Sequence, residues 1–193
     1  MNFKGTPVKA FGLTSSTGRA GRIAAQIVIL DVPKEFTRDP EFIIELKTDS
    51  ENDRLILAKV KPAATLQETV SKVQERIAGS TPSEGDSYTR LRVPKLNFRI
   101  LKNYDELLKK NLVLSRTDLD EYFFLVASQM IRFRLDEHGA VLRSEGKAEA
   151  MKSAWKAALI FDEPFLILLQ RKDAANPYFA LWVDNAELLV PAQ

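Results

Sequence analysis

The sequence predicts an α+β fold built from multi-stranded antiparallel sheets with two or three helices. Short apolar segments of strand length recur along the chain, separated by polar turn residues. One segment has clear helical periodicity, but strands and helices do not alternate as they do in a parallel sheet with crossover helices. With 193 residues and 45% hydrophobic content the chain can bury a sizeable core, so we expect one domain over residues 1–193.

Two pairs of apolar segments have the pattern of β-hairpins. Glu41–Thr48 and Arg54–Val60 are separated by a turn-rich stretch, and Pro164–Gln170 and Tyr178–Val183 by another. Asp, Asn and Ser favour turns because their side chains bond the local backbone. Each pair therefore predicts two adjacent antiparallel strands.

Three further segments predict strands. Ala24–Val32 is mostly apolar, as a buried strand is. Leu91–Leu101 alternates apolar with basic or polar residues, and Pro94, which lacks an N–H, indicates an edge or a bulge. Phe123–Leu135 is apolar, and its second half alternates strictly. That strand would have an unpaired apolar edge, so we expect the chain's own loop, a second copy or a partner chain to cover it.

The clearest helix is predicted at Thr65–Ile77. Thr65 begins a capping-box pattern, and Gly79 is a plausible stop. Tyr104–Leu112 is a second, shorter helix candidate. One side of the first helix carries apolar residues at helical spacing: Leu66, Val70, Val73 and Ile77.

The composition excludes several functional classes. A net charge of +2 without a basic cluster argues against nucleic-acid binding, and no apolar run is long enough for a membrane span. Without cysteine there are no disulfides or thiolate sites, and we predict no metal and no cofactor. The first residues lack the apolar segment of a secretory signal. The glycines of Gly12–Arg22 lack the Gly-Lys-Ser/Thr ending of a phosphate-binding loop.

No catalytic constellation is visible in the sequence. His138 is the single histidine, and nothing pairs it with Ser144 or Ser153 as a triad requires. Asp136 and Glu137 follow a strand, where two acids are expected to be solvated turn residues. We therefore expect a protein that is not an enzyme.

Four segments of the second half of the chain form an ordered set: Val93–Leu96 with Asn103–Leu108, Phe124–Gly139, Phe161–Ile167 and Asn176–Phe179. These segments resemble those of serpins, the serine protease inhibitor fold, and they occur in the order of that family. The resemblance matches only the C-terminal half of the family fold, which implies a truncated serpin-like protein.

The resemblance implies a reactive loop, a protease-baiting segment, at about residues 140–159. Gly139 and Pro164 are 25 positions apart, about what such a loop requires. Trp155 would be a contact anchor for a partner. The implied hinge residues are Glu137, Gly139, Ala140, Leu142 and Ser144, and the candidates for the scissile bond are Lys152, Ser153 and Ala154.

The residues of the loop leave two structures open. Small or apolar residues alternate with mostly charged ones from Ala140 to Met151, which suits a strand that inserts into a sheet. Glu145–Leu159 is also rich in Ala, Lys and Glu, which favours an exposed helix or a disordered loop.

Departures from the family pattern decide which function we expect. Inhibitory serpins have small residues just after the hinge, whereas this chain has bulk and charge at Leu142–Glu145, and Gln129 stands where the family tends to have histidine. We therefore expect a non-inhibitory binding or structural role. The alternative is a serine protease inhibitor that acts through the loop. The implied partner is a serine protease or another protein chain, with a homo-oligomer through a sheet edge as a further option.

Overall fold

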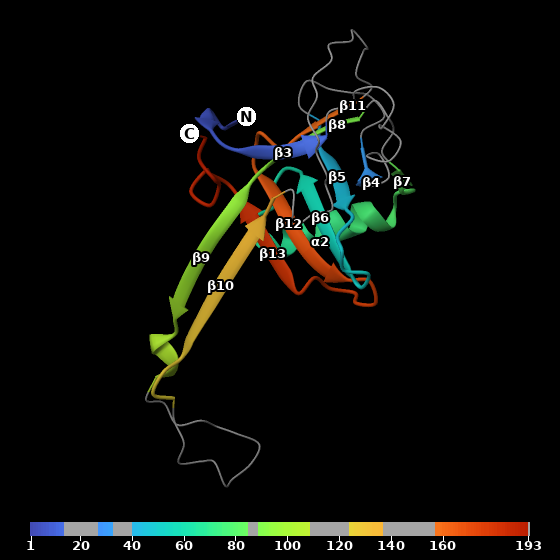
Figure 1. Ribbon diagram of the computed structural model, residues 1–193. Helices are drawn as coiled ribbons and strands as arrows, with labels where there is room; N and C mark the ends of the chain where they lie inside the picture. Colours follow the sequence, from blue (N-terminus) through green and yellow to red (C-terminus); the bar gives the residue numbers. More distant parts are fainter. Residues whose placement is uncertain (14–26, 33–39, 85–88, 109–123, 137–156, 193) are drawn as a thin grey trace. The chain divides into compact units, whose positions relative to one another are not determined.

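The computed structural model describes residues 1–13, 27–32, 40–84, 89–108, 124–136 and 157–192 (Figure 1). The chain divides into two compact units. The body unit comprises Met1–Leu96 and Arg134–Gln193, and the ribbon unit comprises Asn97–Phe133. Most of the predicted strands and the one clear helix belong to the body unit.

The largest sheet among the described residues has six strands, and all of its neighbouring strands are antiparallel. Both predicted hairpins are confirmed, because β5 (Phe42–Leu46) pairs with β6 (Asp53–Lys59) and β12 (Phe165–Arg171) pairs with β13 (Phe179–Val183). Strands β6 and β12 are also neighbours, so the two hairpins form one continuous sheet. In sheet order the strands are β13 (Phe179–Val183), β12 (Phe165–Arg171), β6 (Asp53–Lys59), β5 (Phe42–Leu46), β4 (Ile27–Asp31) and β7 (Ser83–Glu84).

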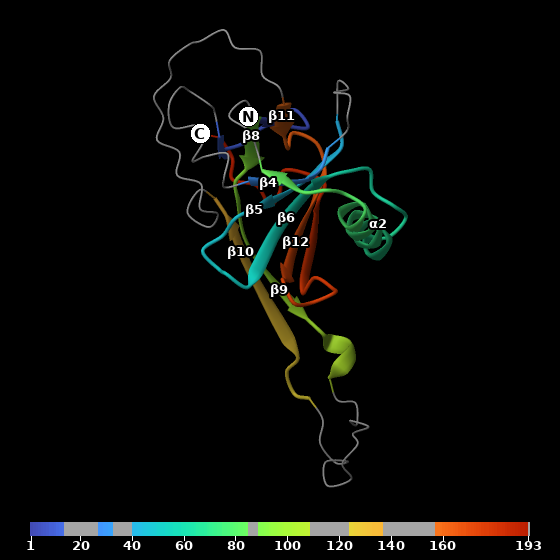
Figure 2. The ribbon, with the colours of Figure 1, turned by 90° about the vertical axis from the view of Figure 1, so that its right-hand side faces the viewer.

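Helix α2, Leu66–Ala78, lies against this sheet (Figure 2). Thr65 caps its first turn, since the hydroxyl accepts a hydrogen bond from the backbone N–H of Glu68 at 3.1 Å. Gly79 ends the helix as predicted, although its φ of −86° is right-handed and needs no glycine. The predicted helix is therefore confirmed, with both ends where its capping residues indicate.

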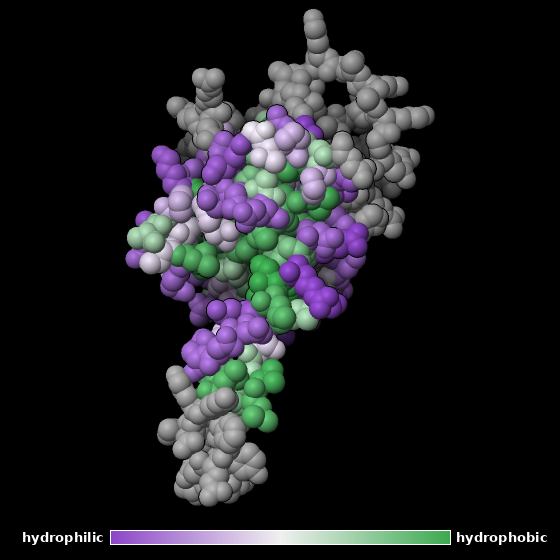
Figure 3. All heavy atoms as spheres, turned by 90° about the vertical axis from the view of Figure 1, so that its left-hand side faces the viewer, coloured by the Kyte–Doolittle hydropathy of each residue, from purple (hydrophilic) through white to green (hydrophobic). Residues whose placement is uncertain are grey.

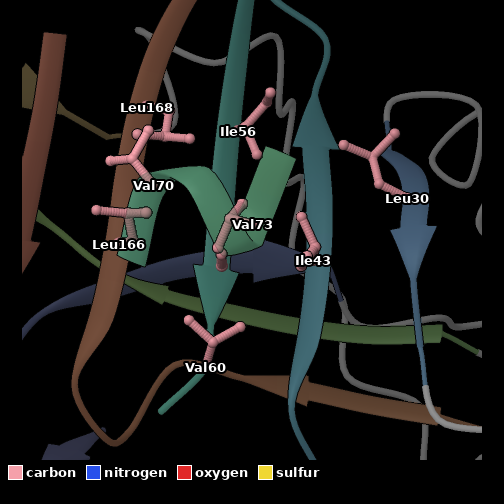
Figure 4. Close-up of a cluster of buried hydrophobic side chains, with 9 residues drawn as sticks. Leu30, Ile43, Ile56, Val60, Val70, Val73, Leu166 and Leu168 are labelled. Atoms are coloured by element: carbon pink, nitrogen blue, oxygen red, sulfur yellow. The ribbon is translucent and has the colours of Figure 1, made fainter. Parts of the chain in front are cut away.

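The core beneath α2 joins the helix to four strands of the sheet (Figure 4). Val70 and Val73 of the helix are buried, while Leu66 at the start of the predicted stripe is exposed. The strands supply the rest of this cluster: Leu30, Ile43, Ile56, Ala58, Leu166 and Leu168, with Val60 beyond the end of β6.

The opposite face of the same sheet is covered by aromatic rings. Phe165 and Ile167 alternate along β12 with the residues beneath the helix, and all are buried, as a strand covered on both sides requires. The ring of Phe161 lies 4.9 Å from that of Phe42 and 5.0 Å from that of Phe165. Phe3, in the short strand β1 (Asn2–Phe3) that pairs with β2 (Thr6–Pro7), completes the group at 6.1 Å from Phe165.

A second sheet of the body unit has the order β11, β8, β3. Strand β8 (Thr89–Pro94) pairs antiparallel with β3 (Ala10–Leu13) and parallel with β11 (Ala157–Ile160). The sequence does not predict β3, β11 or a parallel pair. At Gly12 (φ +155°) the strands approach so closely that a Cβ atom would lie 1.9 Å from the carbonyl oxygen of Leu91.

The ribbon unit contains most of a two-stranded sheet of β9 (Leu96–Asn103) and β10 (Ser128–Leu135), with the 3-10 turn η1 (Asp105–Leu107) after β9. Phe98 and Phe133 lie on the same face of this sheet, with ring centroids 5.7 Å apart. The alternating half of the predicted Phe123–Leu135 strand is therefore confirmed as β10.

The prediction of one strand at Leu91–Leu101 is wrong, because the segment contains β8 and β9 in two different sheets. The strands meet at Lys95, whose N–H donates to the carbonyl of Lys9 at 2.9 Å and whose carbonyl accepts from the N–H of Val190 at 2.8 Å. Pro94 precedes this break, which a residue without an N–H favours.

The prediction of two or three helices is also wrong for the described residues, where α2 is the one α-helix. In the candidate Tyr104–Leu112, only η1 forms a 3-10 turn, Leu108 is extended, and residues 109–112 lie outside the described residues. The N–H of Tyr104 donates to Ala127 across the ribbon at 2.8 Å, so strand pairing overrides the local helix propensity. No helix in the described ranges is long and apolar enough to cross a membrane.

Candidate functional site

The segment between β10 and β11 is the candidate site, and the structure describes both of its flanks. All of the implied site residues lie outside the described residues: Glu137, Gly139, Ala140, Leu142, Ser144, Lys152, Ser153, Ala154 and Trp155. His138 lies outside them too. What the structure describes is therefore the pair of anchors on either side, residues 134–136 and 157–162, which both belong to the body unit.

The first anchor is the end of β10. Leu135 and Asp136 are both buried, with Asp136 only 7% exposed. The guanidinium of Arg134 donates to the Asp136 carboxylate, with Nε to Oδ2 at 2.6 Å. A buried carboxylate is costly without such a partner, so this pair stabilises the chain where β10 ends. The expectation that Asp136 is a solvated turn residue is wrong.

The second anchor begins with strand β11. Leu159 is fully buried, and Ala157 to Ile160 pair with Thr89 to Arg92 of β8. The helical alternative for Glu145–Leu159 is therefore wrong at its end, where the last three residues are in a strand. Parallel pairing to β8 supplies hydrogen bonds that a lone Ala-rich segment lacks, so tertiary structure overrides helix propensity.

Beyond β11 the chain is held by the aromatic ring of Phe161 and by the ion pair between Asp162 and Lys59. The N–H of Phe161 donates to the carbonyl of Arg92 at 3.0 Å, and its ring lies in the aromatic group. The next residue, Asp162, accepts a hydrogen bond at 2.8 Å from Nζ of Lys59, which is 7% exposed. Lys59 also donates to the carbonyl of Ile160 at 3.4 Å. Position 162 is thus tied to β6 in the six-stranded sheet.

Sequence reasoning missed both ion pairs, although one carried a signal. Lys59 is the one charge within the apolar run Leu55–Val60, and a charge in such a run requires a partner when the strand is buried. The distant Asp162 has no local pattern that marks it as that partner. Arg134 and Asp136 are two positions apart on an exposed-looking strand end, which hides the burial of the carboxylate.

The residues with shifted pKa values lie outside the two anchors. Burial lowers the pKa of Arg76, but hydrogen bonds to Asp31 and Glu41, at 2.7 and 2.6 Å, outweigh it and raise the pKa. Burial and Asp53 raise the pKa of Tyr178. Within the described ranges no group of three metal-ligating side chains is assembled. The flanks of the candidate site thus provide fixed ends for the segment between them.

The two anchors hold the two ends of the candidate segment. Residues 137–156, 20 positions in all, join the end of a strand in one sheet to the start of a strand in another. Connections of this length are uncommon and are usually functional, since a rigid scaffold fixes their ends.

Comparison of the sequence with models of protein families and with curated proteins gives no match. Solved structures do match, at low sequence identity. Serpin48 of the insect Tenebrio molitor is 14% identical with a TM-score of 0.52, over 91% of this chain and 45% of that one.

Two further structures agree. The complex of thyroxine-binding globulin with thyroxine is 14% identical with a TM-score of 0.55, over 92% of this chain and 46% of that one. A serpin from the trematode Schistosoma haematobium is 11% identical with a TM-score of 0.55, over 93% and 53%. The chain spans about half the length of the serpin structures it matches. In agreement with the four sequence segments, it therefore has a serpin-like fold.

Proposed function

We propose that this chain is a non-inhibitory binding protein that contacts a protein partner through residues 140–156. The observation that carries the proposal is the pair of anchors, because buried contacts fix the chain at Asp136 and again at Ile160–Asp162. Fixed ends reduce the entropy that a binding segment loses when it is ordered by a partner. Trp155, two positions before β11, is the residue we expect to anchor the contact.

The sequence of the segment supports binding over inhibition. Insertion of a cut loop into a sheet requires small residues at the first inserting positions, and Leu142 and Arg143 are large. A protease also needs extended chain on both sides of the bond it cuts, and only Trp155 and Lys156 separate Ala154 from β11. Among proteins of similar fold, thyroxine-binding globulin is described in complex with thyroxine, so the fold also serves binding.

The alternative function is inhibition of a serine protease through the same segment. Lys152 followed by Ser153 favours it, because a trypsin-like enzyme cuts after a basic residue. This alternative predicts that Lys152→Ala abolishes inhibition of a trypsin-like protease and that Lys152→Phe transfers inhibition to a chymotrypsin-like one. Lys156→Ala is the matched control, since it removes the same charge close to the start of β11.

One experiment decides between the two. The chain is treated with limiting trypsin-, chymotrypsin- and elastase-like proteases, the cut is located by mass spectrometry, and intact and nicked proteins are melted. Binding without inhibition predicts cleavage within 140–156, no SDS-stable complex, and melting temperatures that agree to within about 2 °C. A covalent complex on the gel, or a melting temperature raised by about 10 °C or more after nicking, would contradict the proposal.

A further inference from the structure

The turn between β5 and β6 combines a hydroxyl side chain with acidic residues at fixed spacing. Hydrophilic side chains are common on the molecular surface (Figure 3), so charge alone does not mark a site. A spacing of hydroxyl and acid is more specific, because protein kinases select their substrates partly by charge pattern. In the described ranges three serine or threonine residues have an acidic residue both one and three positions later: Thr48, Ser50 and Ser83.

The structure distinguishes Ser50 from the other two. It is exposed in the turn 47–52, outside both of the strands that the turn connects. Ser83 belongs to β7 and pairs with Ile29 of β4. Thr48 is half-buried, and its hydroxyl donates to the carbonyl of Ser50 at 3.3 Å. A kinase must draw the substrate chain into its own groove, and an exposed turn yields to this while its strands stay paired.

The acidic residues surround the hydroxyl of Ser50 in space as well as in sequence. The hydroxyl donates to Oδ2 of Asp53 at 2.7 Å. Asp49 and Glu51, on either side of the serine, are both exposed. Three carboxylates thus lie within the five residues 49–53, which suits a binding groove lined with basic side chains.

The turn between β12 and β13 supplies cationic groups at the same end of the sheet (Figure 1). Arg171 of β12 is directly opposite Asp53 of β6, and opposed side chains of an antiparallel pair share a face. Lys172 follows it, and its N–H donates to the carbonyl of Asn52 at 2.9 Å. The hydrogen bond to Asp173 raises the pKa of Arg171 most, and the charge of Asp53 raises it further. An added anion beside Asp53 would therefore meet a guanidinium.

We propose that Ser50 is a phosphorylation site for an acidophilic serine/threonine kinase and that Arg171 receives the phosphate. In the transfer, Oγ of Ser50 forms a bond to the γ-phosphorus of ATP, and the bond between that phosphorus and the bridging oxygen breaks to release ADP. The hydroxyl proton passes to the catalytic aspartate of the kinase. The inference does not depend on whether residues 140–156 bind or inhibit, because it concerns different residues.

The product has a different set of contacts in the turn. Phosphorylation removes the hydroxyl proton that Ser50 donates to Asp53 and adds a charge of about −1.5 to −2. The phosphate and the Asp53 carboxylate repel each other, whereas a guanidinium forms charge-assisted hydrogen bonds to phosphate. The phosphate therefore turns from Asp53 toward Arg171 and links the two neighbouring hairpin turns.

Phosphorylation of the full, folded chain tests the recognition step. The chain is incubated with MgATP and an acidophilic kinase, and mass spectrometry locates the phosphate at early times. We expect Ser50 to react at least about fivefold faster than Thr48 or Ser83, since its backbone lies in an exposed turn. A kinase that requires basic residues near the hydroxyl is expected to leave Ser50 unmodified. Preferential phosphorylation of Thr48 or Ser83 would overturn the inference.

Loss of the neighbouring carboxylates tests the charge pattern. Glu51→Gln with Asp53→Asn is expected to lower kcat/KM for Ser50 by about tenfold or more, because the basic groove of the kinase loses two ion pairs. Asp173→Asn is the matched control, since it removes an exposed carboxylate that is distant in sequence from Ser50, and it should leave the rate unchanged. A double variant phosphorylated as fast as the wild type would contradict recognition through these acids.

Phosphorus NMR of the phosphorylated chain tests the receiving group. A guanidinium beside the phosphate favours the dianion, so it lowers the second pKa of the phosphoserine. Arg171→Gln is therefore expected to raise that pKa by about 0.3 or more. Lys61→Gln removes an exposed charge just beyond the other end of β6 and, at an ionic strength of about 0.15 M, should leave the pKa unchanged. The same phosphoserine pKa in the Arg171 variant and the wild type would overturn the assignment of Arg171.

Discussion

The body unit and the ribbon unit are built from strands of similar composition, yet they use their apolar residues in opposite ways. Strand β6 of the body unit reads Asp-Arg-Leu-Ile-Leu-Ala-Lys, and its last five residues are buried. Strand β10 alternates apolar and basic residues, and most of its residues are exposed. The difference lies in the neighbouring elements. Strand β6 is flanked by two strands and covered on both faces, whereas among the described residues β10 pairs with one strand.

Apolar content does not by itself define a core. Strands in the middle of a sheet are stabilised on four sides, and each buried apolar side chain contributes roughly 1.5–3 kcal/mol. Among the described residues, the two strands of the ribbon form a sheet only with each other. We therefore expect the body unit to contribute most of the stability of the chain.

The largest expected effect contrasts a core residue with a ribbon residue. Ile56→Ala removes a fully buried side chain beneath α2 and is expected to lower the free energy of unfolding by about 3 kcal/mol. Met130→Ala, at a position 44% exposed, is expected to change it by less than about 0.5 kcal/mol. Urea unfolding followed by circular dichroism measures both. Equal losses would break the distinction between the units.

The second prediction concerns the close approach of β3 to β8. Gly12→Ala would place a Cβ atom 1.9 Å from a backbone oxygen of Leu91, so the strands must separate, and we expect a loss of about 2 kcal/mol. Gly79→Ala is the control, because its Cβ would meet nothing closer than 3.6 Å. A Gly12→Ala variant as stable as the wild type in urea would show that this sheet contributes little to the body unit.

The third prediction tests the anchor after β11. Asp162→Ala leaves the buried ammonium of Lys59 without its carboxylate, and we expect a loss of about 1–2 kcal/mol. Lys59→Met with Asp162→Ala replaces the pair by apolar groups and should recover much of that loss. Thermal melting compares the two variants. If the double variant is less stable than the single one, the ion pair is more than a fixed end for the candidate site.

Much of the body unit is predictable from local pattern. The hairpins β5–β6 and β12–β13 follow from strand-length apolar runs around polar turns, and α2 follows from its cap and its stripe. These elements have periodicity that no tertiary contact overrides. The missed strands are short, and β11 lies in an Ala-rich segment that favours a helix until β8 supplies a parallel partner.

The place of the candidate site stays a prediction, and its anchors were not predicted. Four family-like segments indicate a connection that follows β10 and precedes a strand at Phe161–Ile167. Strand β10 is confirmed and β12 begins at Phe165, but the chain first forms β11, which the sequence does not predict. The anchors depend on contacts across about a hundred positions, such as Lys59 with Asp162, which no local pattern encodes. The side-chain roles within 137–156 stay predictions.

The smallest expected effect concerns a charge pair in an exposed turn of the body unit. It tests whether the contribution of such a pair to stability depends on solvent exposure or on the unit in which the pair lies. In the β12–β13 hairpin, a hydrogen bond from Arg171 and the charge of its guanidinium lower the pKa of Asp173. The donor atom, Nε of Arg171, lies 3.1 Å from Oδ1 of Asp173. A lowered folded-state pKa means that the pair stabilises the fold above the ordinary pKa of aspartate, and that this contribution is lost as pH falls through the folded-state value. Both groups are exposed, so the contribution is small.

Asp173→Asn should therefore change the melting temperature slightly at pH 7 and not at all at the lowest pH where the chain stays folded. Melting curves from pH 7 down to about pH 3 measure this difference for the variant and the wild type. Since the pair is screened by salt, the difference at pH 7 should shrink when the ionic strength is raised to about 1 M. A difference that grows as the pH falls would mean that Asp173 acts through contacts other than Arg171.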